Sequence, residues 1–209
     1  MLVVNLMPRF QALGHEVGVV VFNGQRTALM ERLERECPEC KLYRLGTGYY
    51  NPWYIVKLIG IMRQYDVVHT HNSSPQLFAA IANIFCHKRL VTTEHSTNNR
   101  KRERGGLLRL IDRWMYHHYD TVICISEIAE KKLREYISLP LTAYGLERRT
   151  QNEERGRRTK NICTINNGVD VEAIHQAAPL EELKTKRFVA VMVAGFREAK
   201  DQDTLIKAM

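Results

Sequence analysis

Three stretches of this chain share one pattern: an apolar, β-branched run that ends in polar or reactive side chains and is followed by a helix-like segment. The stretches are Asp66-Val-Val-His-Thr-His71, Leu90-Val-Thr-Thr-Glu-His95 and Thr121-Val-Ile-Cys-Ile-Ser126. Alternating strands and helices predict an α/β fold with a parallel sheet, in which ligands bind outside the carboxyl ends of the strands. We therefore expect His71, Glu94, His95 and Ser126 to share one rim, and an active site is the leading hypothesis.

The same alternation extends along most of the chain. Apolar periodicity and turn residues predict helices over 2–13, 26–36, 53–63, 76–85, 107–119 and 127–137. They predict further strands over 16–22, 41–45 and 162–165. Ser73 or Ser74 is expected to cap the helix that follows the first of the three runs. Ser126 has two interpretations, a helix cap and a ligand-binding hydroxyl, and capping is favoured.

Composition limits the class of protein. With 209 residues and 44% hydrophobic content, the chain is long enough for a real core in one large or two smaller domains. Its net charge of +8 favours an anionic partner: phosphate, nucleic acid or a lipid surface. No apolar stretch approaches the roughly 20 residues that cross a bilayer, and the amino terminus lacks a signal-peptide pattern. We expect a cytoplasmic protein, with the inner face of the membrane as one place of action.

Five cysteines in no repeating pattern favour reduced thiols over a disulfide framework. Cys37 and Cys40 form the one close pair, and no second ligand pair accompanies them at a spacing typical of zinc. We therefore expect no metal site and no cofactor.

A second domain is expected to begin near the end of the chain. Residues 187–194 form an almost wholly apolar strand, which requires burial on both faces, yet only one helix, 202–209, follows it. We interpret 1–168 as a first domain whose first strand is missing, 169–186 as a connector, and 187–209 as the truncated start of a second domain. The alternative is that the strand over 187–194 packs onto the first domain.

The candidate site residues have competing interpretations. His71, at a strand end, is expected to contact ligand, whereas His69 within the strand is expected to be packed. Glu94 can orient or charge the imidazole of His95. The run from Arg100 to Arg104 fits phosphate binding and a solvated face equally well.

Six motifs in order resemble the GT-B glycosyltransferases of glycosyltransferase family 4. They are Gly14-His-Glu-Val-Gly-Val-Val-Val21, Tyr65-Asp-Val-Val-His-Thr-His71, Thr93-Glu-His95, Ile125-Ser-Glu127, Asn167-Gly-Val-Asp170 and Val193-Ala-Gly-Phe-Arg-Glu-Ala-Lys200. They span nearly the whole chain. The resemblance implies two Rossmann-like domains, the first holding the acceptor and the second a nucleotide-sugar donor. It also implies sugar transfer with retention of anomeric configuration and without an obligatory metal, in the synthesis of cell-surface polysaccharide.

The resemblance also implies roles for individual residues. His95 is similar to the family's histidine near the sugar, and Asn167 and Gly168 are similar to the hinge between domains. The loop with Asn98, Asn99 and Arg100 is expected to face a glycan or lipid-diphosphate acceptor, with peripheral contact to the membrane.

Departures from the family pattern leave two questions open. An arginine normally stands directly before the Phe or Leu of the second-domain loop, but here that place is Gly195, so either Arg197 or Lys200 is expected to bind the donor diphosphate. The glycine-rich first loop and the nucleotide pocket are absent from 1–209, so we expect this stretch alone to be inactive. The alternative function is a basic module that binds nucleic acid or anionic membrane without catalysis.

Overall fold

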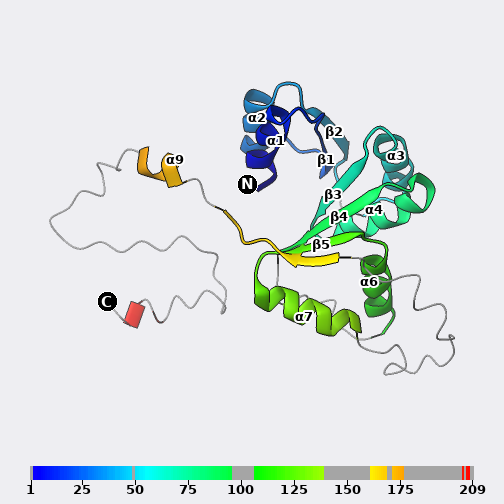
Figure 1. The fold of residues 1–209 in the computed structure, drawn as a ribbon. Coiled ribbons are helices and arrows are strands. Elements are labelled where there is room, and N and C mark those ends of the chain that lie inside the picture. The colour runs from blue at the N-terminus through cyan, green and yellow to red at the C-terminus, as the bar shows by residue number, and fades with distance from the viewer. Residues whose placement is uncertain are drawn as a thin grey trace. The chain divides into compact units, whose positions relative to one another are not determined.

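Two parallel sheets organise the first part of the chain (Figure 1). The computed structural model describes residues 2–48, 50–95, 106–138, 161–168, 171–176, 204 and 206–207. One sheet pairs β1 with β2, and the other has the strand order β3-β4-β5-β6. The strands are β1 Gly18–Asn23, β2 Lys41–Gly46, β3 Val67–His71, β4 Arg89–Glu94, β5 Thr121–Cys124 and β6 Asn161–Thr164. Each pairing is parallel, which confirms the predicted α/β class.

Helices alternate with these strands along the chain. They are α1 Leu2–Ala12, α2 Ala28–Glu36, α3 Trp53–Met62, α4 Ser73–Cys86, α6 Leu107–His117, α7 Glu127–Ser138 and α9 Val171–Gln176. The helices and strands predicted between residues 2 and 165 are found within a few residues of their expected bounds, as is usual for element ends.

The three apolar runs identified in the sequence become neighbouring strands. In the register of the sheet, His71 of β3 lies opposite Thr93 of β4, and Glu94 of β4 lies opposite Cys124 of β5. Because the strands are parallel, their carboxyl ends meet at one edge of the sheet. The chemistry-bearing residues that end each run are therefore collected at that edge.

The prediction that Ser73 or Ser74 caps α4 is wrong. The helix begins earlier than expected, so that both serines lie in its first turn and Asn72 takes the capping position. Asn72 makes no side-chain capping bond, and its backbone adopts φ 72° and ψ 156°. This region is essentially restricted to glycine, and such outliers cluster at functional sites. Pro75 in the first turn is tolerated because the amide there needs no helical partner.

Ser126 does cap α7. Its Oγ accepts a hydrogen bond from the backbone N–H of Ala129 at 3.2 Å, and its carbonyl accepts one from Glu130 at 3.0 Å. Thr27 caps α2 in the same manner, through the N–H of Met30 at 3.3 Å. The favoured interpretation of Ser126 as a helix cap is therefore confirmed.

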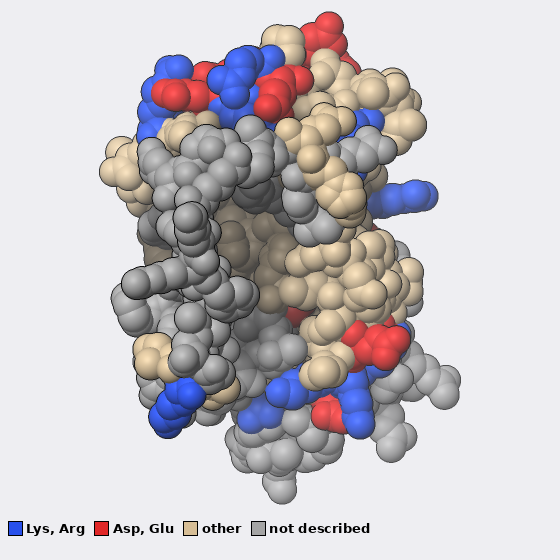
Figure 2. Space-filling view, turned by 90° about the vertical axis from the view of Figure 1, so that its left-hand side faces the viewer, with Lys and Arg blue, Asp and Glu red and all other residues tan. Residues whose placement is uncertain are grey.

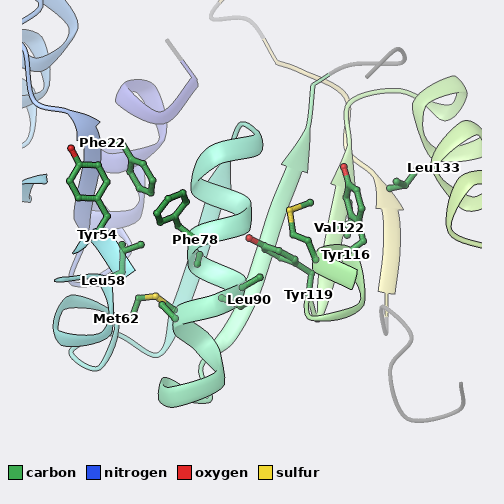
Figure 3. Close-up of a cluster of buried hydrophobic side chains, with 14 of the residues drawn as sticks. Phe22, Tyr54, Leu58, Met62, Phe78, Leu90, Tyr116, Tyr119, Val122 and Leu133 are labelled. Atoms are coloured by element: carbon green, nitrogen blue, oxygen red, sulfur yellow. The ribbon is translucent and has the colours of Figure 1, made fainter. Parts of the chain in front are cut away.

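The main core lies between the four-stranded sheet and the helices that pack on it (Figure 3). Its fully buried members include Leu90, Tyr116 and Val122. Burying a side chain of the size of Leu or Val contributes roughly 1.5–3 kcal/mol. Tyr54, Phe22 and Phe78 extend this core to the two-stranded sheet through edge-on aromatic contacts, with ring centroids 5.4 Å apart for Phe22–Tyr54 and 5.5 Å for Phe22–Phe78.

A smaller core lies on the other face of the two-stranded sheet. Val4 of α1 and Leu33 of α2 are buried there together with Cys37, and Val19 and Leu42 of the strands pack against them. The helices α1 and α2 therefore cover one face of β1 and β2, whereas α3 covers the face that carries Phe22.

The chain divides between Asn167 and Gly168 into two units. The described helix of the second unit is α9. The strand expected over 187–194 lies outside the described residues, and residues 204, 206 and 207 near the end are helical. Within the described ranges, no helix is both long and apolar enough to cross a bilayer.

Candidate active site

A row of three histidines lies at the carboxyl edge of the four-stranded sheet. His71 is the last residue of β3, and His95 directly follows β4. Nδ1 of His71 lies 3.1 Å from Nε2 of His95, and the two rings are 5.4 Å apart between centroids with 32° between their planes. The structure thus brings together the two imidazoles that the sequence placed on one rim.

His69 is the third member of the histidine row. Its ring stacks on that of His71 with 4.4 Å between centroids, and its Nε2 lies 2.8 Å from Oγ1 of Thr93. The sequence predicted a packed histidine without a place in the site. The spacing of two residues along a strand, which puts both rings on one face, was the signal that pointed to this arrangement.

The environment of the row favours neutral imidazoles. Burial lowers the pKa of His71 to about 4, and the neighbouring charges of His69 and His95 act in the same direction. Burial also lowers the pKa of His69, with a further contribution from His95; packing desolvates this ring although part of its surface is open to water. At neutral pH both rings therefore carry one N–H donor and one acceptor nitrogen, and one ring of the His71–His95 pair donates to the other.

Glu94 is separated from His95 by the pleat of its strand. Its side chain is buried, and Oε2 accepts a hydrogen bond from the hydroxyl of Tyr116 in α6. The hydrogen bonds of the described residues thus pair Glu94 with Tyr116 and His95 with His71, rather than with each other. The expected pairing of Glu94 with His95 is not formed, because successive side chains of a strand point to opposite faces.

A buried polar network supports the ends of β3 and β4, which the sequence did not reveal. The hydroxyl of Tyr119 donates to the carbonyl of Gln76 at 2.9 Å and lies 2.9 Å from Oγ1 of Thr70. Nε2 of Gln76 donates to Oγ1 of Thr92 at 2.7 Å, and that hydroxyl donates to the carbonyl of Thr70 at 3.1 Å. Burial raises the pKa of Tyr119, so its hydroxyl keeps its proton. Thr70 immediately precedes His71, so the network holds the backbone from which the His71 ring projects.

Other predicted site residues are distributed as follows. Ser126 lies at the same edge, two residues beyond β5, where its hydroxyl serves α7. Asn167 and Gly168 flank the division between the two units. The predicted acceptor-loop and donor-phosphate residues lie outside the described residues: Asn98, Asn99, Arg100, Arg197 and Lys200.

The described residues contain no group of three or more His, Cys, Asp or Glu side chains arranged to hold a metal ion. Neighbouring rings of the histidine row are tilted by 32° to each other, with centroids 4.4 Å and 5.4 Å apart. Cys37 donates through its thiol to Oε1 of Gln11 at 2.9 Å, and burial raises the pKa of the neighbouring Cys40 to about 11.

An open depression of about 410 Å³ lies at the opposite edge of the fold. It is lined by residues at the amino ends of β1 and β2 and by their neighbours: Gln11, Gly14, His15, Glu16, Val17, Glu39, Lys41 and Tyr65. Ligands of parallel α/β sheets bind at the carboxyl ends of the strands, so the histidine row is the better candidate for the site of chemistry.

Comparison with known proteins agrees with the resemblance found in the sequence. The sequence model of one protein family, described as Glycosyltransferase Family 4, matches residues 1–142. This match covers more than half of the chain and includes the histidine row, so the chain belongs to glycosyltransferase family 4. No curated protein and no solved structure matches the chain. Family membership supports a general role in the transfer of a sugar from a donor to an acceptor.

Proposed function

We propose that this chain belongs to a retaining glycosyltransferase of the GT-B type, in which its first unit forms the acceptor side and its second unit is the start of the donor side. In this proposal the enzyme moves a sugar from a nucleotide-diphosphate donor to a glycan or lipid-linked acceptor in cell-surface polysaccharide synthesis. The single observation that carries the proposal is the contact between His71 and His95 at the carboxyl edge of the sheet, in a chain that belongs to the family.

In this proposal the two histidines have different roles. His95 is exposed, whereas His71 is half-buried and its lowered pKa keeps it neutral. Nε2 of His95 is engaged by His71, so Nδ1 of His95 is the ring nitrogen that is left to hydrogen-bond the sugar being transferred. His95 is then the catalytic residue, and His71 is a positioning residue that fixes the orientation and the tautomer of the His95 ring.

The second unit supplies donor binding in this proposal. Arg197 or Lys200 binds the diphosphate, Asn167 and Gly168 act as a hinge, and no metal is required. Asn98, Asn99 and Arg100 contact the acceptor. The resemblance in these motifs is the support for these roles, and no ligand geometry enters the argument.

Transfer kinetics of the full-length enzyme test the role of His95. Replacing His95 with Ala should lower kcat by about 10²-fold or more, because a positioned proton-transfer or hydrogen-bonding group contributes on this scale. His71→Gln retains hydrogen-bonding groups in a neutral side chain and should have a smaller effect on kcat. An unchanged rate for His95→Ala, with the fold intact by circular dichroism, contradicts the proposal.

Titration with a nucleotide diphosphate separates the two candidate phosphate ligands. Arg197→Ala and Lys200→Ala should differ, and the variant with the larger loss of affinity identifies the residue that binds the diphosphate. Equal, unaltered affinities in both variants reject the phosphate assignment.

A second candidate function rests on charge. Residues 100–104 hold four basic side chains and one acidic, and residues 147–160 hold six basic and three acidic, so these two segments supply +6 of the net charge of +8. On the face shown in Figure 2, described basic and acidic side chains are intermixed. Ion pairs of this kind among the described residues include those of Glu34 with Arg26 at 3.4 Å and with Arg44 at 2.9 Å. An anion-binding module therefore depends on those two segments. Steeply salt-dependent binding to RNA or to anionic vesicles supports this alternative, and negligible binding at physiological salt rejects it.

A further inference from the structure

Two cysteines lie in the turn that leads from the end of α2 into β2. Cys37 ends α2, and its backbone N–H donates to the carbonyl of Leu33 at 2.8 Å. The backbone N–H of Cys40 donates to the carbonyl of Cys37 at 3.0 Å, so residues 37–40 form a hydrogen-bonded β-turn. Pro38 takes the second position of this turn, where its fixed φ is favoured. Such a turn brings its first and last Cα atoms within about 7 Å of each other.

The side chains of these two cysteines lie on the same side of the turn. Cys37 is buried in the smaller core, and the half-buried Cys40 packs against that same core. Burial, followed by the charge and the hydrogen bond of the neighbouring Cys37 thiol, raises the pKa of Cys40 to about 11. The two thiols are therefore close together, as are the two Cα atoms. A disulfide joins cysteines whose Cα atoms lie about 4.4–6.8 Å apart, which is within the span of a β-turn.

The other three cysteines belong to the four-stranded sheet and its helices. Cys86 of α4 donates through its thiol to the carbonyl of Ile59 at 3.6 Å and packs against the main core. In the register of β5 and β6, Cys163 lies opposite the residue before Cys124. Successive side chains of a strand point to opposite faces, so the thiols of Cys124 and Cys163 point apart. The geometry of a disulfide is therefore met by the pair in the turn.

We propose that Cys37 and Cys40 are a redox-active dithiol, which closes to an intramolecular disulfide by exchange with a small-molecule disulfide such as oxidised glutathione. Cys40 is the more exposed of the two, and its thiolate attacks one sulfur of the reagent and releases the first thiol. The thiolate of Cys37 then attacks Sγ of Cys40, forms the internal S–S bond and displaces the second thiol. Two cysteine thiols are oxidised, one reagent disulfide is reduced to two thiols, and each cysteine proton passes to a departing sulfur.

The position of the pair at the carboxyl end of α2 determines how this dithiol behaves. A cysteine at the amino end of a helix has a lowered pKa, because the helix dipole stabilises its thiolate. A stabilised thiolate favours the reduced pair and makes its disulfide a strong oxidant. At the opposite end of a helix this stabilisation is lacking, so the disulfide of Cys37 and Cys40 forms slowly at neutral pH and resists reduction once formed. The pair is then suited to a lasting change of state rather than to the oxidation of other proteins.

Closing the disulfide changes a contact of α1. Oε1 of Gln11 in α1 accepts a hydrogen bond from the thiol of Cys37 at 2.9 Å, and Nε2 of Gln11 donates to Oε2 of Glu39 at 2.5 Å. The disulfide has no S–H group, so Gln11 loses the first of these two bonds. The turn precedes β2 and the histidine row lies at the carboxyl edge, so oxidation alters the packing of α1 and not the proposed reacting groups. This inference goes beyond the proposed function, and its test reads thiols rather than sugar transfer.

Peptide mapping of the 209-residue chain tests the proposal. The folded chain is incubated with equimolar reduced and oxidised glutathione, quenched with acid, denatured, alkylated and digested with trypsin. Cleavage after Arg35 and Lys41 gives one peptide, 36–41, that holds both cysteines. We expect this peptide to be unalkylated and lighter than the dithiol form by two hydrogen atoms. Because the fold holds the two thiols together, the ratio of disulfide to dithiol should be about tenfold or more above that of the same chain in urea.

The outcomes of this mapping decide the matter. A dithiol in the folded chain, a stable mixed disulfide with glutathione, or a ratio equal to that in urea overturns the proposal. Two single variants test the order of the steps: Cys37→Ser should take up glutathione at Cys40, whereas Cys40→Ser should leave the buried Cys37 unmodified. The reverse pattern overturns the assignment of Cys40 as the attacking residue.

Amide hydrogen exchange tests the link from the turn to α1. Exchange in peptides covering α1 should quicken by about two- to fivefold when the disulfide forms, because one hydrogen bond of Gln11 is lost. Gln11→Ala lacks the acceptor from the start and provides the matched control, in which oxidation should leave the exchange of α1 unchanged. Equal exchange of α1 before and after oxidation of the original chain, or an equal response in Gln11→Ala, overturns this link.

Discussion

Acidification should destabilise this protein through His71. The pKa of the ring is lowered from 6.5 to about 4 in the folded state, so between these values the unfolded chain binds more protons than the folded one. The stability supplied by the neutral ring is fully present above pH 6.5 and is lost as the pH falls toward 4. His69, whose pKa is also lowered, adds to this loss.

The magnitude follows from the shift in the pKa of His71. A change from 6.5 to about 4 corresponds to about 3.4 kcal/mol at 1.36 kcal/mol per pKa unit. Because the ring is only partly buried and water screens its neighbours, we expect acidification to lower the free energy of unfolding by about 1–2 kcal/mol through His71. In His71→Gln the group cannot titrate, and the free energy of unfolding should fall less between pH 7.5 and pH 5.

Urea denaturation followed by circular dichroism over a pH series measures this difference. His87→Gln provides a matched control, because His87 is an exposed histidine at the end of α4, away from the histidine row. It should retain the pH dependence of the original chain. Identical pH slopes for the original chain and His71→Gln would refute the argument that packing keeps this ring neutral.

Three further substitutions test the support of the site, each by urea denaturation. Tyr119→Phe removes the buried hydroxyl that lies between Thr70 and the carbonyl of Gln76, so the free energy of unfolding should fall by about 1–3 kcal/mol. Tyr43→Phe, which removes a partly exposed hydroxyl, should lower the free energy of unfolding less. Equal losses in the two variants would contradict the role of the buried network. Asn72→Gly should raise the free energy of unfolding by about 1 kcal/mol, because glycine adopts φ 72° and ψ 156° without strain. Asn72→Val should lower the free energy of unfolding. A more stable Val variant than Gly variant would mean that the backbone of Asn72 is not strained. Ser126→Ala should cost about 1 kcal/mol through loss of the α7 cap and Ser126→Asp should restore most of it, a result that a purely ligand-binding hydroxyl would not produce.

The strand-end positions of the site were predictable because they depend on local pattern. Each apolar run predicts a strand of a parallel sheet, and the polar residues that end the run must lie at the carboxyl edge of that sheet. This reasoning placed His71 and His95 on one rim, and their ring nitrogens are 3.1 Å apart. It also identified Ser126 as a helix cap, because the hydroxyl of a serine directly before a helix can accept a hydrogen bond from a backbone N–H of the first helical turn.

The contacts of Glu94 and His69 were not predictable in the same way. Adjacency in sequence suggested that Glu94 serves His95, but the pleat turns the two side chains apart and Tyr116, 22 residues further along the chain, takes the carboxylate. His69 was expected to be packed within its strand, on the same face as His71, but the contact between the two rings was not foreseen. The start of α4 was misplaced because Asn72 adopts a backbone conformation that its residue type rarely takes.

The sequence by itself determined the alternation of strands and helices, the parallel sense of the sheet and the edge at which the reactive side chains collect. These properties follow from hydrophobic period and chain connectivity, which are local. The tertiary structure alone decided which imidazoles touch, that burial keeps His71 neutral, and that the described strands fall into two sheets. These depend on contacts between residues distant in the chain, and desolvation and strand pairing exist only once those residues have been packed together.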